Sequence, residues 1–139
     1  MPGRDLYHDT VVHALHTDGW TITHDPLSLS YGGRDLYVDL GAERLTLAAE
    51  KGHHKIALEI KSFLGMSLIR DLEEAVGQYQ VYRSVLAEIE ADRSLYLAVA
   101  QRVYDSLFTE RFGQLILTSL QLRLMVFDEQ RERIVAWIP

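Results

Sequence analysis

The segment Ile56-Ala57-Leu58-Glu59-Ile60-Lys61 places a carboxylate and an amine two positions apart in an otherwise apolar run. Side chains two apart on a β-strand point to the same face, so Glu59 and Lys61 would share one face. Hydrolysis of a phosphodiester needs a hard cation, held by carboxylates, that polarises the phosphoryl oxygen and lowers the pKa of water. It also gains from a fixed positive charge beside the phosphate. Glu59 as a metal ligand and Lys61 as that charge therefore indicate phosphodiester chemistry.

A second acid is needed to hold a cation together with Glu59. We expect Asp39 to be this ligand of Mg²⁺ or Mn²⁺, and the sequence leaves Glu43 and Glu50 open as rivals. The structural alternative is that alternating charges on a strand form a solvated face or a cross-strand ion pair.

Gln78 and Tyr82 belong to the helix expected after this strand. They lie four positions apart and so share a helical face, from which Gln78 would support the catalytic group of Asp39, Glu59 and Lys61. The alternative is that Tyr82 only packs against the core while Gln78 stays at the surface.

The histidines are the other side chains that could bind a metal. No pair of them has a zinc-motif spacing, so we expect them at the surface or in turns rather than in a metal site. They are His8, His13, His16, His24, His53 and His54.

Hydrophobic periodicity predicts the elements that position these residues. The amino-terminal part reads as a helix over 5–18 ended by Gly19, strands Trp20–Thr23 and Leu27–Tyr31, a turn at Gly32-Gly33 and an extended segment Arg34–Leu40. The carboxy-terminal part reads as a helix from Ser67 to about Glu90, a buried strand Leu95–Val99, short helices over 103–108 and 112–117, and a hairpin of Leu122–Phe127 with Ile134–Ile138.

The segment Ala42–Glu50 has an ambiguous pattern, for which we favour a strand. Lys51-Gly52-His53-His54 is typical of a hairpin turn that leads into a strand over Lys55–Phe63.

A turn centred near Gly52 and His53 would place Thr46 opposite Glu59. Asp39 would then reach Glu59 only through a bend or bulge around Gly41.

The order of elements predicts one domain over residues 1–139 with an α/β or α+β fold, a mixed central sheet flanked by helices. The net charge of −6 argues against a protein that coats nucleic acid by charge alone. Bound divalent cations or a basic partner would offset that charge.

The balance of 47% apolar and 24% charged residues is that of a soluble globular protein, and no apolar run is long enough to span a membrane. The amino terminus does not look like a secretory signal, and the chain has no cysteine, so we expect it in the cytoplasm.

Asp39, Glu59-x-Lys61 and Gln78-x-x-x-Tyr82 together resemble the PD-(D/E)xK nuclease superfamily, and the last element is similar to that of its RecB-like branch. The resemblance implies a restriction-endonuclease-like fold. In related nucleases an upstream acid on the first helix assists the site, and the sequence leaves its equivalent unassigned between Asp5 and Asp9.

Nearly the whole chain resembles XisH, a cyanobacterial family of fdxN element excision controlling factors. The resemblance rests on Arg4–His8, Asp18–Pro26, Asp39–Glu43, Glu59–Gly65, Asp71–Glu74 with Gly77–Tyr79, and Leu95–Val99. It implies control of the excision of a DNA element during heterocyst differentiation, beside a site-specific recombinase and a companion factor, XisI.

Two functions stay open at this point. The first is a Mg²⁺- or Mn²⁺-dependent DNA endonuclease with Asp39, Glu59, Lys61 and Gln78 as its site. The second is a catalytically silent regulator that binds the recombinase, XisI or DNA. Association with copies of itself stays open under both.

Overall fold

The computed structural model describes residues 5–45 and 53–139. Helices and strands follow one another in the order that the periodicity predicts. They are α1 (His8–Thr17), β1 (Thr21–His24), β2 (Leu27–Tyr31), β3 (Arg34–Val38), β4 (Leu40–Leu45), β5 (His53–Ile60), α2 (Leu68–Ile89), β6 (Arg93–Ala100), α3 (Gln101–Val103), the π-helical turn η1 (Tyr104–Phe108), α4 (Arg111–Ser119), β7 (Leu124–Asp128) and β8 (Arg133–Ile138).

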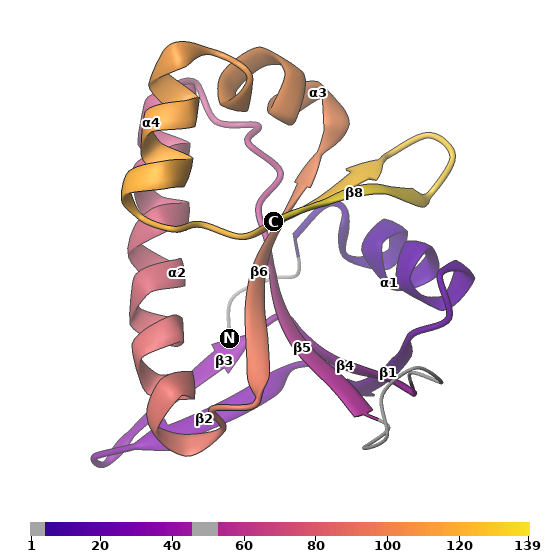
Figure 1. Ribbon diagram of the computed structural model, residues 1–139, viewed down its shortest axis with the longest axis vertical. Helices are drawn as coiled ribbons and strands as arrows, with labels where there is room; N and C mark the ends of the chain where they lie inside the picture. The colour runs from indigo at the N-terminus through magenta and orange to yellow at the C-terminus, as the bar shows by residue number, and fades with distance from the viewer. Residues whose placement is uncertain (1–4, 46–52) are drawn as a thin grey trace.

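Six strands form a mixed sheet in the order β1-β4-β5-β6-β7-β8 (Figure 1). β5, β6 and β7 run parallel, and the other neighbours pair antiparallel. Parallel strands need crossover connections, which are α2 between β5 and β6, and α3, η1 and α4 between β6 and β7. The carboxyl ends of β5, β6 and β7 therefore meet at one edge. The predicted mixed sheet flanked by helices is confirmed, and it is compatible with a restriction-endonuclease-like architecture.

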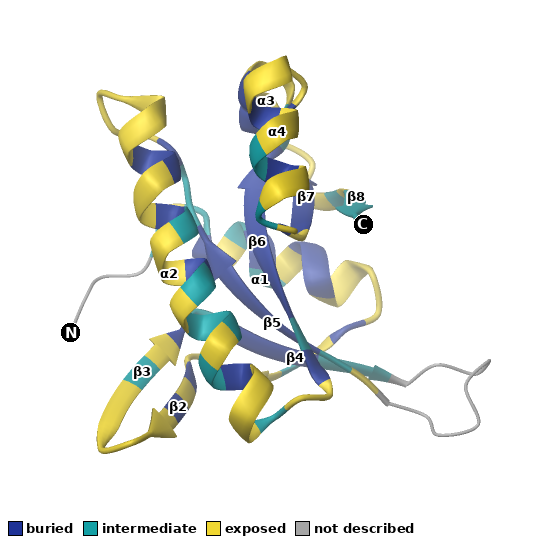
Figure 2. Ribbon diagram, turned by 60° about the vertical axis from the view of Figure 1, so that its left-hand side comes forward, coloured by how far each residue is buried: buried dark blue, intermediate teal, exposed yellow. Residues whose placement is uncertain are grey.

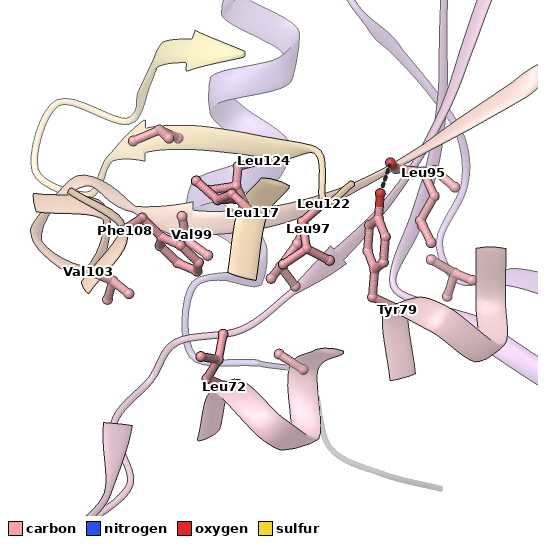
Figure 3. Packing of buried hydrophobic residues seen from close by; sticks show 14 of the residues in the cluster. Leu72, Tyr79, Leu95, Leu97, Val99, Val103, Phe108, Leu117, Leu122 and Leu124 are labelled. Carbon is pink, nitrogen blue, oxygen red and sulfur yellow. Dashed lines mark hydrogen bonds between the residues drawn. The ribbon is translucent and has the colours of Figure 1, made fainter. Parts of the chain in front are cut away.

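Different elements bury the two faces of the sheet. α2, α4 and the β2–β3 hairpin cover one face, where Tyr79 and Leu97 belong to one apolar cluster (Figure 3). α1 covers the other face, where Val11 and Leu15 join a second cluster. Figure 2 shows the consequence: the central strands are buried, while the outer sides of the helices are exposed.

The alternation of side chains along β5 follows from these two layers. Ile56, Leu58 and Ile60 belong to the α1 side, and Ala57 to the α2 side. Glu59 therefore faces the α2 side, as the two-residue period predicts.

Helix α2 begins as predicted, because Ser67 caps it: its hydroxyl accepts the backbone N–H of Arg70 at 3.2 Å. The hydroxyl of Tyr79 fixes the helix to the sheet, donating to the Leu95 carbonyl at 3.2 Å and accepting the Arg123 N–H at 3.1 Å (Figure 3). None of the helices within residues 5–45 and 53–139 combines the length and apolar character that a membrane crossing requires.

The β2–β3 hairpin forms a separate two-stranded sheet. Its two-residue turn has φ of 58° at Gly32 and 81° at Gly33, where a side chain would be strained. The extended segment predicted over Arg34–Leu40 is interrupted, since β3 ends at Val38, Asp39 forms a bend and β4 starts at Leu40. This bend places Asp39 where the chain passes from hairpin to sheet.

The predicted turn at His53-His54 is wrong, because β5 begins at His53. The imidazole of His54 packs on the ring of Trp20, with centroids 5.3 Å apart, which favours the extended chain there. Residues 46–52, which include the rest of that turn and the end of the strand predicted over Ala42–Glu50, lie outside the described residues.

Candidate functional site

Asp39 and Glu59, called the acid pair below, lie side by side where β4 begins and β5 ends. Leu40 pairs with Leu58 in the antiparallel ladder, so the next position outward brings Asp39 to Glu59. The Asp39 N–H donates to Oε1 of Glu59 at 3.3 Å, and the Ile60 N–H donates to Oδ2 of Asp39 at 2.8 Å. Each carboxylate thus accepts a backbone hydrogen bond from the other's strand.

The register predicted for these strands is wrong. β4 pairs regularly from Leu40 with Leu58 to Leu45 with His53, so Asp39 meets Glu59 without a bulge at Gly41, and Thr46 does not lie opposite Glu59. The reason is that β5 begins at His53, so the ladder includes a residue that the prediction had assigned to the turn.

The rival acids are placed differently. Glu43 lies opposite Lys55, and its Oε2 is 3.9 Å from an Arg93 guanidinium nitrogen, farther along β4 from Glu59. Glu50 lies outside the described residues. The acid beside Glu59 is therefore Asp39.

Burial dominates the electrostatics of the acid pair. Glu59 is only 8% exposed, and this burial, together with the charge of Asp39, raises its pKa to about 8. Burial also raises the pKa of Asp39, although the Ile60 N–H and the charge of His8 act in the opposite direction. Two adjacent carboxylates in such a place hold a proton near neutral pH unless another positive charge replaces it.

Asp5 is a third acid within electrostatic reach, since its charge raises the pKa of both members of the acid pair. Its Oδ2 accepts the Ser62 N–H at 3.0 Å, and its Oδ1 accepts the Tyr7 N–H at 2.9 Å. Asp5, one of the two upstream acids that the sequence left open, thus lies just before α1 and within reach of the acid pair.

Lys61 also points toward α2, as predicted from its sharing a face with Glu59. Its Nζ lies 3.3 Å from Oε1 of Glu74.

The phenol of Tyr82 lies near the acid pair. Its pKa is raised to about 12, mainly by burial and then by the charges of Glu59 and Asp39. Glu74, Gln78 and Tyr82 are spaced by four and form one stripe of α2. Gln78 is exposed in the middle of that stripe, four residues from Glu74 and four from Tyr82.

His8 is a residue of this region that sequence reasoning missed. It was expected at the surface, yet it is only 4% exposed, and its Nε2 lies 2.9 Å from Oδ1 of Asp25. Its spacing of three from Val11 and seven from Leu15, both in the core, was a sign of burial in the sequence.

The oxygen donors of the acid pair fit a hard divalent cation, whose charge would favour the ionised carboxylates that burial disfavours. Magnesium is held in proteins by one or two carboxylates, with water and substrate phosphate completing its shell. Within residues 5–45 and 53–139 no three histidine, aspartate or glutamate side chains gather as a complete metal site. Ligands beyond the acid pair would therefore come from water and phosphate.

A hollow of about 960 Å³ lies away from the acid pair, between α2, α4 and the amino end of β6. Its lining includes Tyr79, Arg83 and Arg123. The Arg83 guanidinium donates to the carbonyls of Leu120 and Gln121 at 2.9 and 2.8 Å, and so holds the end of α4. The contacts of Arg83 in this hollow therefore serve the packing of α4 against α2.

The family model of the XisH protein matches residues 1–135. The chain belongs to the XisH family. A search of the curated proteins gave no match. Two solved structures are similar over nearly the whole chain: an XisH family protein from Nostoc punctiforme PCC 73102, 38% identical, and an fdxN element excision controlling factor protein from Anabaena variabilis, 42% identical. They cover 97% and 98% of this chain and 100% of their own, each with a TM-score of 0.88. The predicted XisH resemblance is confirmed.

Proposed function

We propose that this XisH family protein controls excision of a DNA element as a metal-dependent DNA endonuclease whose site is the acid pair. The observation that carries the proposal is the reciprocally bonded pair of half-buried Asp39 and buried Glu59 at the carboxyl edge of β5. The similar protein from Anabaena variabilis is described as an excision controlling factor. Excision requires the cutting of DNA, and phosphodiester hydrolysis is chemistry that paired carboxylates support.

Asp39 and Glu59 would hold Mg²⁺ or Mn²⁺, which when bound polarises the phosphoryl oxygen and lowers the pKa of water. Glu59 must first give up the proton that burial and its neighbour favour, so the site becomes competent as pH rises toward about 8. The Lys61 ammonium, two residues from Glu59 and on the same side of the sheet, would orient water or balance charge that develops on the phosphate. Gln78 supports the bound substrate from α2.

The charge of −6 requires help in binding DNA. We assign that help to the cation at the acid pair and to partners: a site-specific recombinase, an XisI-like companion or a second copy of this chain. The protein then contributes the site, while its partners contribute phosphate contacts and the choice of DNA target.

A second candidate function is non-catalytic control of a recombinase by the same scaffold. The specific observation in its favour is the contact between Lys61 and Glu74, because this pair neutralises the amine that hydrolysis would use. In this alternative the acid pair has no catalytic role, and the protein controls excision only by binding the recombinase.

A nicking assay tests the proposal. Supercoiled plasmid is incubated with Mn²⁺ and the wild-type protein, Glu59→Gln or Glu88→Gln; the last removes an exposed carboxylate of α2 as a matched control. We expect open-circular DNA with the wild type and Glu88→Gln, and a loss on the order of 100-fold with Glu59→Gln. A plasmid left intact by the wild type, or nicked equally by Glu59→Gln, would contradict the proposal and favour the second candidate.

A further inference from the structure

A second cationic side chain lies at the edge of the sheet where the parallel strands end, the edge that also holds the acid pair. Arg102 is part of α3, which follows directly from the end of β6 (Figure 1). Its guanidinium donates to the Ser62 carbonyl at 2.8 Å. Since β5 and β6 are parallel neighbours, this bond fixes the arginine to the loop that follows Glu59 and Lys61.

Contacts around the Ser62 peptide form a closed ring. Asp5 accepts the N–H groups of Ser62 and Tyr7, at 3.0 and 2.9 Å. The Tyr7 hydroxyl donates to Oε2 of Glu129 at 2.6 Å, and Nε of Arg102 lies 3.5 Å from the same oxygen. The Arg102 guanidinium is thereby linked, through Glu129 and Tyr7, to Asp5. Asp5 is the acid whose charge raises the pKa of both members of the acid pair.

The ion pair between Glu129 and Arg102 is long. Their separation of 3.5 Å exceeds the usual 2.7–3.2 Å of an N–H···O hydrogen bond. The side chain of Arg102 is 41% exposed, whereas that of Lys61 is 22% exposed and lies against Glu74. A partly exposed ion pair of this kind contributes little stability, so a phosphate can replace it.

A guanidinium offers planar, paired N–H donors that match the oxygens of a phosphate. Ligands of sheets with parallel strands bind at the carboxyl ends of those strands. We propose that Arg102 binds a phosphate of duplex DNA at the acid pair, and that Glu129 holds its guanidinium in position until the phosphate replaces the carboxylate. This inference rests on the proposed function and names a substrate contact of the same site.

Binding of a fluorescein-labelled DNA duplex, followed by anisotropy with Ca²⁺ in place of Mn²⁺, tests the inference apart from cleavage. Arg102→Gln is expected to weaken binding about 10-fold and to reduce the salt dependence by about one phosphate contact. Glu129→Gln frees the guanidinium and is expected to tighten binding several-fold. The matched control, Arg34→Gln, removes an equal charge from the exposed tip of the β2–β3 hairpin and is expected to leave the affinity unchanged.

Calorimetry with Mn²⁺ alone separates substrate contact from a structural role. Arg102→Gln is expected to keep the Mn²⁺ affinity of the wild type. Equal loss of DNA affinity in Arg102→Gln and Arg34→Gln would overturn the inference, and so would a parallel loss of Mn²⁺ and DNA binding in Arg102→Gln. If instead the wild type binds DNA through Arg102 but nicks no plasmid, the proposed hydrolysis fails while the phosphate contact stands.

Discussion

Glu59 shows how one strand position decides the chemistry of this protein. The alternation of β5 turns its carboxylate toward α2, where it becomes buried beside Asp39 instead of reaching water. Burial of an acid favours its protonated form. The same geometry that makes the acid pair costly to ionise makes it a place where a divalent cation can replace the proton.

The free energy of unfolding should fall as pH rises from about 4.5 to about 8, because over this range the unfolded chain has lost the Glu59 proton that the folded protein keeps. The pKa of Glu59 is raised from 4.5 in the unfolded chain to about 8 in the fold, so between these values the folded state binds more protons than the unfolded state. The contribution is fully present below about pH 4.5 and is lost as pH approaches about 8, with a slope of at most about 1.4 kcal/mol per pH unit. Glu59→Gln should flatten this slope in urea unfolding across that range. An unchanged slope, or one equally flattened by Glu88→Gln, would contradict the electrostatic account.

The sequence predicted part of this site at the level of single residues. The two-residue period was sufficient to place Glu59 and Lys61 on one face, and Asp39 was correctly preferred as the nearby acid. Glu74 and Arg102 could not be foreseen, because their contacts with Lys61 and Ser62 join segments whose distance in the fold is set by α2 and by the pairing of β5 with β6.

At the scale of elements, the order and type of the helices and strands were predictable, whereas several of their boundaries and the register of β4 with β5 were not. Ser67 marks the start of α2, and the apolar run Leu95–Val99 lies within β6. The register of β4 with β5 was not predictable, because glycine at position 52 suggested a turn centre that gives a different pairing from the observed Leu40 with Leu58. The error moved Asp39 away from Glu59, although the two are neighbours in the ladder.

The packing of α4 on η1 allows a matched test with two glycines. A Cβ at Gly113 would lie 2.0 Å from the Leu107 carbonyl oxygen and 2.7 Å from the Phe108 Cα, both backbone atoms. Gly113→Ala should therefore destabilise the protein by about 3 kcal/mol, since only a backbone shift relieves the clash. A Cβ at Gly77, exposed in α2, meets nothing within 4 Å. Gly77→Ala should stabilise the protein by about 0.5–1 kcal/mol. Thermal unfolding measures both, and similar melting temperatures for the two variants would contradict this packing.

At the scale of the whole molecule, the fold gathers distant segments at one edge of the sheet. Asp39 precedes β4, Lys61 follows β5, Arg102 follows β6 and Glu129 follows β7. A parallel centre with antiparallel flanks produces this gathering, because strands that run in the same direction end together. An acidic protein thereby places two cationic side chains at the same edge of the sheet as the acid pair. This local arrangement, rather than the net charge, is what the proposal requires for contact with DNA.

Titration calorimetry of Mn²⁺ into the wild-type protein near pH 7, in two buffers of different protonation enthalpy, tests most directly whether the acid pair is a cation site. Since the pKa of Glu59 is about 8, binding should release about one proton, visible as a heat that depends on the buffer. Glu59→Gln should lose this release and bind on the order of 100-fold more weakly, while Glu88→Gln should behave as the wild type. Binding of Mn²⁺ that releases no proton and is equally strong in Glu59→Gln would contradict the account.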